Sequence, residues 1–339
     1  MTARADRHIV AEMGEKPAFS ERRAGPDDSG RRLDRVLRSC LGELPLSAIY
    51  GALRRGRILL NGRRAEGAAR VEEGDLISFD PRLLPRDGIE VEAAAATASG
   101  DAAWSGVDAL AGLLALATAD LLFMNKPRGM LVHGEDSLED RVREALRERS
   151  RGSLSFNPGP LHRLDRNTSG LVVFPRSAAG ARAFTALVRE RRVEKRYLAL
   201  LDGVLEGEEA WRDRIERDGG RRSSSVGEAG RPASAIARPL LAAGGRSLAL
   251  VLLGTGLTHQ IRVQAAARGL PLAGDAKYGG RPFPGGYLLH AYALRFPEPP
   301  FADCPDLVVA PPPPGARRRL EGIFGVEALE KALETAVEA

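Results

Sequence analysis

The chain has 339 residues, of which 43% are hydrophobic and 28% charged, a composition that is typical of folded globular proteins and excludes wholesale disorder. Aromatic residues make up only 5%, which argues against a protein that stacks successive bases of a single strand on aromatic rings. The 50 Lys and Arg against 45 Asp and Glu give a formal net charge of +5. This charge favours a polyanionic partner, with a basic surface that has no partner as the alternative.

The cysteines and the hydropathy pattern exclude several further classes. Cys40 and Cys304 lie far apart and form no Cys-x-x-Cys pair, so neither a disulfide framework nor a zinc site is predicted. The N-terminus has no apolar signal-peptide core, and the most apolar stretch, 107–124, is interrupted by aspartates. No G-x-x-x-x-G-K-[ST] phosphate loop occurs. We therefore expect a cytoplasmic protein without a cofactor, a metal or a membrane partner.

The first part of the chain predicts an arm and a small module. Residues 1–28 are polar and mixed in charge, which predicts a flexible arm. In the stretch RRLDRVLRSCLG the apolar residues fall on one helical face, and Gly42 is a suitable end for that helix. Ser47 is expected to cap a second helix, and Asn61-Gly62 to form a two-residue hairpin turn. The module is expected to span 29–80.

This module resembles the alpha-L RNA-binding motif of ribosomal proteins and RNA-modifying enzymes. The resemblance is carried by RRLDRVL, by the second helix, and by GRILLNG and GDLISF, in that order. It implies that the arginines gathered within a few turns form an RNA-binding face, with a solvated run of charges as the alternative. These arginines are Arg54, Arg55, Arg57, Arg63 and Arg64.

The rest of the chain predicts a larger domain between two connecting segments. Residues 81–106 are rich in Ala, Ser and Gly and predict a linker. The second domain is expected over 107–310. The proline run at 311–315 is expected to break any regular element, and VEALEKALETAVEA to form an amphipathic helix. Residues 311–339 are thus predicted to be a Pro-rich segment followed by a C-terminal helix.

Asp165 is the first candidate for a catalytic group. It is the one acidic residue in HRLDRNTSGLVVF, where Arg163 and Arg166 flank it and a short apolar run that predicts a buried strand follows. A carboxylate beside arginine stays ionised and can act as a nucleophile, whereas capping a turn is its structural alternative. The kinase catalytic loop is excluded, because Leu164 separates the Arg from the Asp and neither a Gly-rich loop nor D-F-G accompanies it. A glycosidase needs two carboxylates across one cleft, for which the sequence offers Asp165 and Asp275.

HRLDRNTSGLVVF is similar to the signature of the RluA-type pseudouridine synthases. The segments NKPRGMLVH, KRYLALLDG, TGLTHQIRVQAAARGLPLAGDAKYG and LLHAYALRF occur in that family's order, so the resemblance covers 113–296. It implies an α+β fold, with the small alpha-L domain followed by a pseudouridine synthase domain built on a mixed β-sheet. It also implies that a uridine in structured RNA becomes pseudouridine. In that reaction the glycosidic bond is cut, the uracil turns, and C5 is joined to C1′ of the ribose.

The resemblance also implies roles for individual residues. Asp165 matches the catalytic aspartate, Arg262 the arginine that pairs with it, and Tyr197 the tyrosine that stacks against the target base. The alternatives are a surface arginine and a core tyrosine. Arg163 matches the arginine that fills the space left by the flipped nucleotide, with a phosphate contact as its alternative. Four further residues are expected to orient this core: His162, Lys126, His259 and Thr168. For His162, Lys126 and His259 a structural role is the alternative.

The sequence departs from the family pattern at three positions. Leu257 stands where arginine is usual, Gln264 where histidine often occurs, and Pro175 where the family commonly continues VFAK. These departures concern RNA contacts and substrate choice. We expect a monomer that acts on large-subunit ribosomal RNA, because of the alpha-L module, with transfer RNA as the alternative substrate. A non-enzymatic RNA-binding or assembly factor on the same fold is the alternative function.

Overall fold

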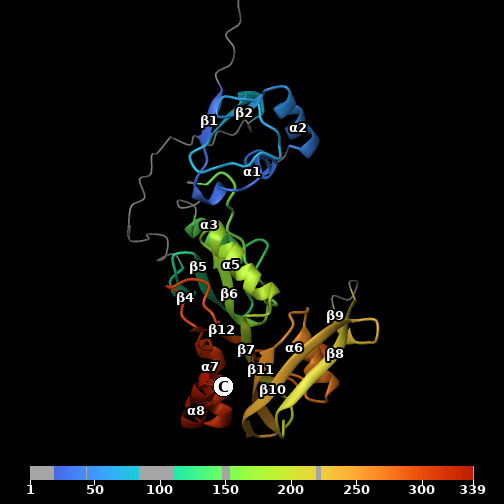
Figure 1. Ribbon diagram of the computed structural model, residues 1–339. Coiled ribbons are helices and arrows are strands. Elements are labelled where there is room, and N and C mark those ends of the chain that lie inside the picture. The colour runs from blue at the N-terminus through green and yellow to red at the C-terminus, as the bar shows by residue number, and fades with distance from the viewer. Residues whose placement is uncertain (1–18, 43, 84–109, 147–152, 219–222, 339) are drawn as a thin grey trace, which may run out of the picture. The chain divides into compact units, whose positions relative to one another are not determined.

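The computed structural model describes residues 19–42, 44–83, 110–146, 153–218 and 223–338. Within these ranges the chain divides into two compact units (Figure 1). The first unit holds the described residues up to 83 together with 153–156, and the second holds 110–146 and 157–338. The predicted linker, 81–106, lies outside the described residues from 84 onward, and so does the predicted arm up to residue 18.

The first unit is a three-stranded antiparallel sheet with two helices. The strand order is β1, β3, β2, and the elements are β1 (Ser20–Arg23), α1 (Leu33–Cys40), α2 (Leu46–Arg54), β2 (Ile58–Leu60) and β3 (Leu76–Phe79), with short 3-10 helices η1 (Pro26–Asp28) and η2 (Pro81–Leu83). The apolar face of α1 packs in a core with residues of β2 and β3. Because Leu33, Val36 and Leu37 are fully buried, the predicted periodicity of this helix is confirmed.

Two predictions about the turns of this unit have different outcomes. Asn61 and Gly62 both have positive φ, and the N–H groups of Leu60 and Arg63 each bond to the other residue's carbonyl, at 2.9 and 3.0 Å. The two-residue turn is therefore confirmed. The prediction that Ser47 caps the second helix is wrong, because α2 begins at Leu46 with Pro45 in the cap position. The extended backbone of Pro45 leads directly into the helix, so Ser47 lies inside it.

The predicted arm, 1–28, extends too far along the chain. Residues 20–23 form β1 against β3, and the Asp28 side chain is buried. Its carboxylate accepts hydrogen bonds from the N–H of Leu154 at 2.8 Å and from the hydroxyls of Ser153 and Ser155. A buried carboxylate needs such donors in place of water. The contacts of Asp28 therefore hold 153–156, which the sequence predicts as part of the second domain, in the first unit.

The second unit is built on a ten-stranded mixed sheet in the order β4, β5, β6, β12, β7, β11, β10, β8, β9, with β13 paired to β12. Among the pairs of this sheet, β6 and β12 run parallel and the others antiparallel. The predicted α+β fold with a mixed sheet is confirmed. The strands are β4 (Leu114–Ala117), β5 (Leu121–Lys126), β6 (Ser169–Pro175), β7 (Glu194–Leu201), β8 (Glu209–Asp218), β9 (Ser223–Val226), β10 (Arg231–Ala243), β11 (Arg246–Leu253), β12 (Leu289–Arg295) and β13 (Leu307–Val309).

Helices cover both faces of this sheet. They are α3 (Leu138–Ala145), α5 (Ala178–Arg189), α6 (Gln260–Ala267), α7 (Pro314–Phe324) and α8 (Val326–Glu338), with the short 3-10 helix η4 (Ala276–Tyr278). Alternate residues of β7 point to opposite faces. Tyr197 and Ala199 join the core that contains Ile261 of α6, whereas Leu198 joins the core that contains Leu320 of α7. In the part of the chain that is described, no helix is long and apolar enough to span a bilayer.

The C-terminal segment forms two helices, where the sequence predicts one. Helix α8 confirms the predicted amphipathic helix, because its apolar face is buried in the core. The expectation that the proline run breaks every regular element is wrong, since α7 begins at Pro314. Proline is tolerated in the first turn of a helix, where its missing N–H has no intrahelical partner. The buried Arg196 of β7 donates to the carbonyls of Ala336 and Val337, at 2.9 and 2.7 Å, and so caps the end of α8.

Candidate active site

Asp165 lies on a tight turn just before a buried strand, as the sequence predicts. Its carbonyl accepts the N–H of the buried Thr168 at 3.0 Å, and every residue of β6 that follows is buried. At Gly170 the backbone has φ 110°, and a Cβ there would lie 2.2 Å from the carbonyl oxygen of Ala291 on β12. Only glycine permits this close approach of the parallel strands. The turn of Asp165 is therefore anchored directly to the centre of the sheet.

Lys126 holds the loop of Asp165 through its buried ammonium. The Nζ atom donates to the carbonyls of Pro127 and Met130, both at 3.0 Å, and of Arg166 at 3.2 Å. Burial lowers the pKa of Lys126 to about 8, while the negative charge of Asp165 acts in the opposite direction. Arg166 adds two further bonds to Gly129, one through its carbonyl and one through Nε. The residue after Asp165 is thus tied to the loop that follows β5.

Arg262 lies on α6 and faces two carboxylates. Its Nε and Nη2 donate to the two oxygens of the buried Asp275, at 2.7 and 2.8 Å, in a bidentate pair. Its Nη1 lies 3.6 Å from Oδ2 of Asp165, an ion-pair distance that is too long for a hydrogen bond. The structure therefore brings Arg262 and Asp165 together, but Asp275 is the stronger partner of the arginine.

Two tyrosines complete the surroundings of this guanidinium. The Arg262 guanidinium carbon lies 4.9 Å from the ring centroid of Tyr278 and 4.5 Å from that of Tyr287. Sequence reasoning missed these tyrosines and the pairing of Arg262 with Asp275. The signals that could have found them are DAKYG, which carries Asp275 and Tyr278 on one turn, and GGYLLHA, which carries Tyr287 into β12.

Tyr197 lies on β7 in the same core, with 8% of its surface exposed. Burial raises the pKa of its phenol, and the negative charge of Asp165 raises it further. Tyr197 is therefore neutral at physiological pH and lies within electrostatic reach of the carboxylate. The stacking of Tyr197 against a base stays a prediction.

The remaining predicted site residues occupy different places. His259 precedes α6, and its Nε2 lies 3.7 Å from Oδ2 of Asp165. His162 instead accepts the N–H of Val173 on Nε2 at 3.1 Å and stacks on Phe184, and burial lowers its pKa to about 4. Its ring therefore supports β6. Arg163 is exposed, which leaves it accessible to a ligand.

Gln264 has polar side-chain partners, and Leu257 joins the same hydrogen-bond network through its backbone N–H. The Leu257 N–H donates to the Gln260 side chain at 3.1 Å, and the buried Gln264 accepts from the same side chain at 3.0 Å. Gln264 also donates to Asp213 of β8 at 2.6 Å, so it ties α6 to the sheet. Pro175 is the last residue of β6, opposite Leu121.

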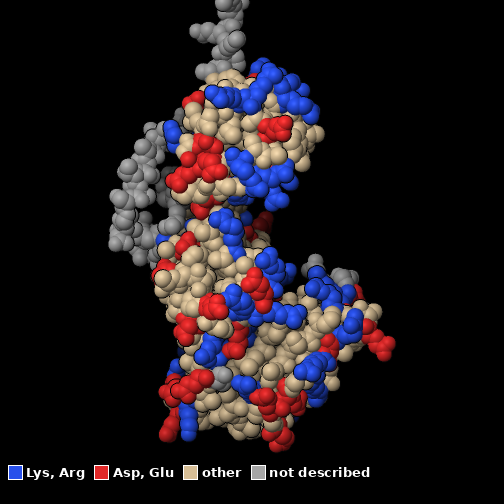
Figure 2. Space-filling view, in the orientation of Figure 1, with Lys and Arg blue, Asp and Glu red and all other residues tan. Residues whose placement is uncertain are grey.

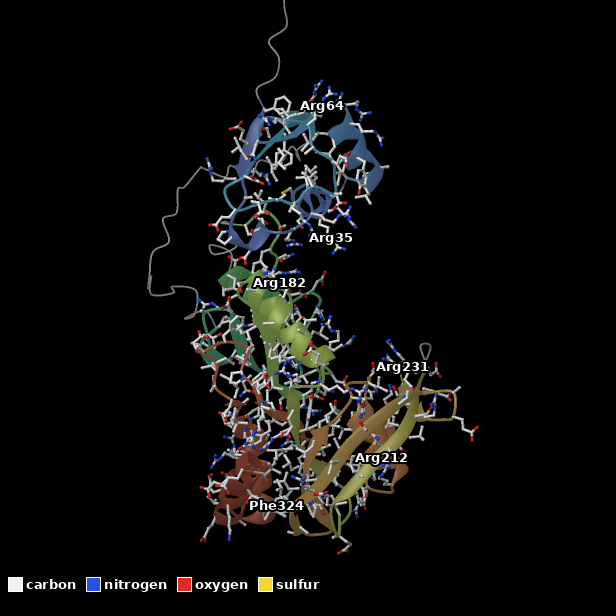
Figure 3. All side chains as sticks on the ribbon, viewed as in Figure 1. Arg35, Arg64, Arg182, Arg212, Arg231 and Phe324 are labelled. Atoms are coloured by element: carbon white, nitrogen blue, oxygen red, sulfur yellow. The ribbon has the colours of Figure 1, made fainter. Side chains whose placement is uncertain are left out.

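The predicted basic face of the first unit lies on α2 and the turn after β2. Figure 2 shows Lys and Arg side chains gathered over this part, and Figure 3 labels Arg64 within it. Arg57 is partly buried and lies 3.8 Å from the Asp80 carboxylate. The other four arginines are exposed: Arg54, Arg55, Arg63 and Arg64.

Comparisons with known proteins bear directly on this arrangement. The family described as RNA pseudouridylate synthase matches residues 120–267. Ribosomal large subunit pseudouridine synthase C of Escherichia coli (strain K12) is 31% identical over 294 residues, which cover 80% of this chain and 87% of that protein. Its namesake in Haemophilus influenzae is 30% identical over 295 residues, 80% of this chain and 85% of that one.

Solved structures agree with this assignment. Human RNA Pseudouridylate Synthase Domain Containing 1 is 28% identical with a TM-score of 0.51, covering 65% of this chain and 94% of that one. Human RNA Pseudouridylate Synthase Domain Containing 4 has a TM-score of 0.53 at 22% identity, over 64% and 95% of the two chains, and shares the fold. With the ordered motifs, the mixed sheet and these identities over most of its length, the chain belongs to the RluA-type family of RNA pseudouridine synthases.

Proposed function

We propose that this chain, acting as a monomer, isomerises specific uridines of large-subunit ribosomal RNA to pseudouridine, with Asp165 as its catalytic carboxylate. The observation that carries the proposal is the pairing of the partly exposed Asp165, 22% accessible, with the nearly buried Arg262. Asp275 and two tyrosine rings fix the arginine, so its position does not depend on Asp165. The relatives named as large-subunit ribosomal synthases support the choice of RNA.

Each possible course of the reaction uses the same carboxylate, that of Asp165. Attack on the uracil ring, attack on C1′, and removal of a proton from the sugar all require an ionised and accessible Asp165. Arg262 places a positive charge 3.6 Å from Asp165, which can replace lost hydration when a substrate excludes water from the site. A uridine must leave its helix to reach the turn, and unstacking it costs a few kcal/mol. The exposed Arg163 is the residue we assign to the space that the nucleotide leaves.

The same geometry argues against the alternatives. A glycosidase needs a second carboxylate that can exchange protons with its substrate. Asp275 is 2% exposed, and both its oxygens are hydrogen-bonded to Arg262. A non-enzymatic RNA-binding factor has no use for an ionised carboxylate that faces a phosphate-rich ligand. We therefore favour catalysis, and we keep transfer RNA as the alternative substrate.

The test is an assay of the purified full chain on separate transcripts of large-subunit ribosomal RNA and of transfer RNA. Pseudouridine is detected at single positions by carbodiimide labelling and primer extension. We expect modification of discrete uridines in the ribosomal transcript, with excess chelator present and no added nucleotide. Modification of transfer RNA alone would contradict the substrate, and a requirement for a metal beyond RNA folding would contradict the cofactor-free chemistry.

Neutralising the basic face of the first unit is expected to weaken RNA binding without changing turnover at saturation. The variant combines Arg54→Gln, Arg55→Gln, Arg63→Gln and Arg64→Gln in the full chain. Replacing an arginine that binds a phosphate should flatten the slope of log affinity against log salt concentration by about one unit. The slope is measured by filter binding between low and high salt.

A matched control removes the same number of charges from exposed arginines of the second unit. It combines Arg141→Gln, Arg189→Gln, Arg191→Gln and Arg318→Gln. We expect a smaller change in slope for this control, because its arginines lie outside the predicted face. Equal slopes for the two variants and the parent chain would show that the first unit does not contact RNA phosphates.

A further inference from the structure

Three segments of the second unit meet at the imidazole of His259. The residue has φ 58°, a conformation that few residues other than glycine adopt. Its Nδ1 lies 2.7 Å from the Tyr278 hydroxyl, which also accepts the backbone N–H of Ser224 at 3.1 Å. Its Nε2 lies 3.7 Å from Oδ2 of Asp165. The Ser224 hydroxyl in turn donates to the carbonyl of Thr258 at 3.0 Å, which fixes β9 to this site.

The direction of these hydrogen bonds determines where the protons lie. The backbone N–H of Ser224 can only donate, so the Tyr278 oxygen accepts that bond and has its own proton to give. Burial raises the pKa of the Tyr278 phenol, so the proton is present at neutral pH. Among the described residues, Nδ1 of His259 is the acceptor recorded for it. A neutral imidazole that accepts on Nδ1 carries its proton on Nε2.

We propose that Ser224 and Tyr278 hold His259 as the neutral tautomer whose Nε2–H points at Asp165, which makes His259 a positioning residue for that carboxylate. The inference rests on the proposed role of Asp165. At 3.7 Å the contact is electrostatic and is longer than a hydrogen bond. Catalytic contacts often shorten only in the substrate complex. Arg262 supplies charge to Asp165, and His259 supplies a directed donor without adding a second charge.

The surrounding charges oppose one another at His259. Burial is the largest effect and lowers the pKa of His259, and the positive charges of Arg262 and Lys277 act in the same direction. The carboxylates of Asp165 and Asp275 favour the protonated ring. Protonation would also remove Nδ1 as an acceptor, so the Tyr278 hydroxyl would lose the acceptor recorded for its proton. The neutral ring is therefore the form that agrees with both its charges and its hydrogen bonds.

The tautomer can be measured directly by NMR. The chain has five histidines, so two-bond ¹H–¹⁵N spectra of histidine-labelled protein contain few signals, and His259→Gln identifies those of His259. We expect an unprotonated Nδ1 and a protonated Nε2. His162 is an internal reference for the other tautomer, because its Nε2 accepts the N–H of Val173 and its proton is therefore on Nδ1. A proton on Nδ1 of His259 at neutral pH would overturn the proposal.

A second experiment tests whether this tautomer of His259 affects the turnover that depends on Asp165. Tyr278→Phe removes the hydroxyl and keeps the ring beside Arg262. We expect mixed tautomers at His259, and kcat lower by about tenfold or more with little change in KM. Tyr292→Phe is the matched control, because its hydroxyl donates to Leu333 in the other core. His259→Gln, which retains an N–H donor, is expected to keep more activity than His259→Ala.

The two experiments separate this proposal from the proposed function. Unchanged kcat and an unchanged tautomer in Tyr278→Phe would overturn the role of His259 while leaving Asp165 in place. A parent chain that modifies no RNA would overturn the proposed function. In that case the spectra still decide whether Nε2 carries the proton, and a proton on Nδ1 would overturn the proposed tautomer of His259 as well.

Discussion

Asp165→Asn is expected to abolish pseudouridine formation, with a fall in turnover of about ten thousandfold or more, because the amide can neither attack nor take a proton. The fold should persist, since the turn depends on the carbonyl of Asp165 and the N–H of Thr168. Among the described residues, the contacts recorded for the carboxylate itself are the longer ones to Arg262 and His259, at 3.6 and 3.7 Å. Single-turnover assays measure the activity. Thermal unfolding and RNA-binding measurements test whether the variant keeps the parental stability and RNA affinity.

Asp136→Asn is the matched control for this change. Asp136 is exposed, and its φ of 53° is a conformation that asparagine tolerates well. We expect parental activity from it. Substantial turnover by Asp165→Asn, with the control unchanged, would show that another group performs the chemistry.

Arg262→Lys is expected to lower turnover by about a hundredfold with a smaller change in RNA affinity. A lysine retains the positive charge, but it lacks the planar fork that bonds Asp275 through two nitrogens while a third faces Asp165. Charge would then remain near Asp165 without a defined direction. Parental turnover in this variant would show that charge alone suffices at this position.

Arg262→Met tests how much the ion pair of Arg262 with Asp275 stabilises the fold. It leaves the Asp275 carboxylate buried without its cation, which should destabilise the fold by about 3–5 kcal/mol. The double variant Arg262→Met with Asp275→Asn removes the stranded charge, so it should regain much of the stability and still lack activity. Recovery of activity in the double variant would contradict a role for Arg262 in catalysis and would leave it a role in folding alone.

Local patterns predicted the elements that carry the site, but not the contacts between them. The apolar run after Asp165 identified β6, and the spacing of Leu33, Val36 and Leu37 identified α1. The bidentate partner of Arg262 could not be read in the same way, because it depends on how the turn of Asp275 returns across α6. His162 and His259 both lie within family motifs. Only their tertiary surroundings show that His162 supports β6 and that His259 is a neighbour of Asp165.

One of the other differences comes from a contact between distant segments, and two come from the rules for where helices begin. Asp28 and Leu154 are 126 positions apart, and no local pattern indicates that a buried carboxylate joins them. Pro314 lies in the first turn of α7, where the general rule that proline breaks helices does not hold. Residue type favours Ser47 as the cap, whereas the extended backbone of Pro45 determines where α2 begins.

The most direct test of the central claim is a map of pseudouridine in ribosomal and transfer RNA from cells with and without this gene. The account predicts that discrete uridines of the large-subunit RNA lose the modification. The parent gene should restore it, and the Asp165→Asn gene should not. An unchanged map in the deleted strain, or restoration by Asp165→Asn, would contradict the claim that this chain modifies that RNA through Asp165.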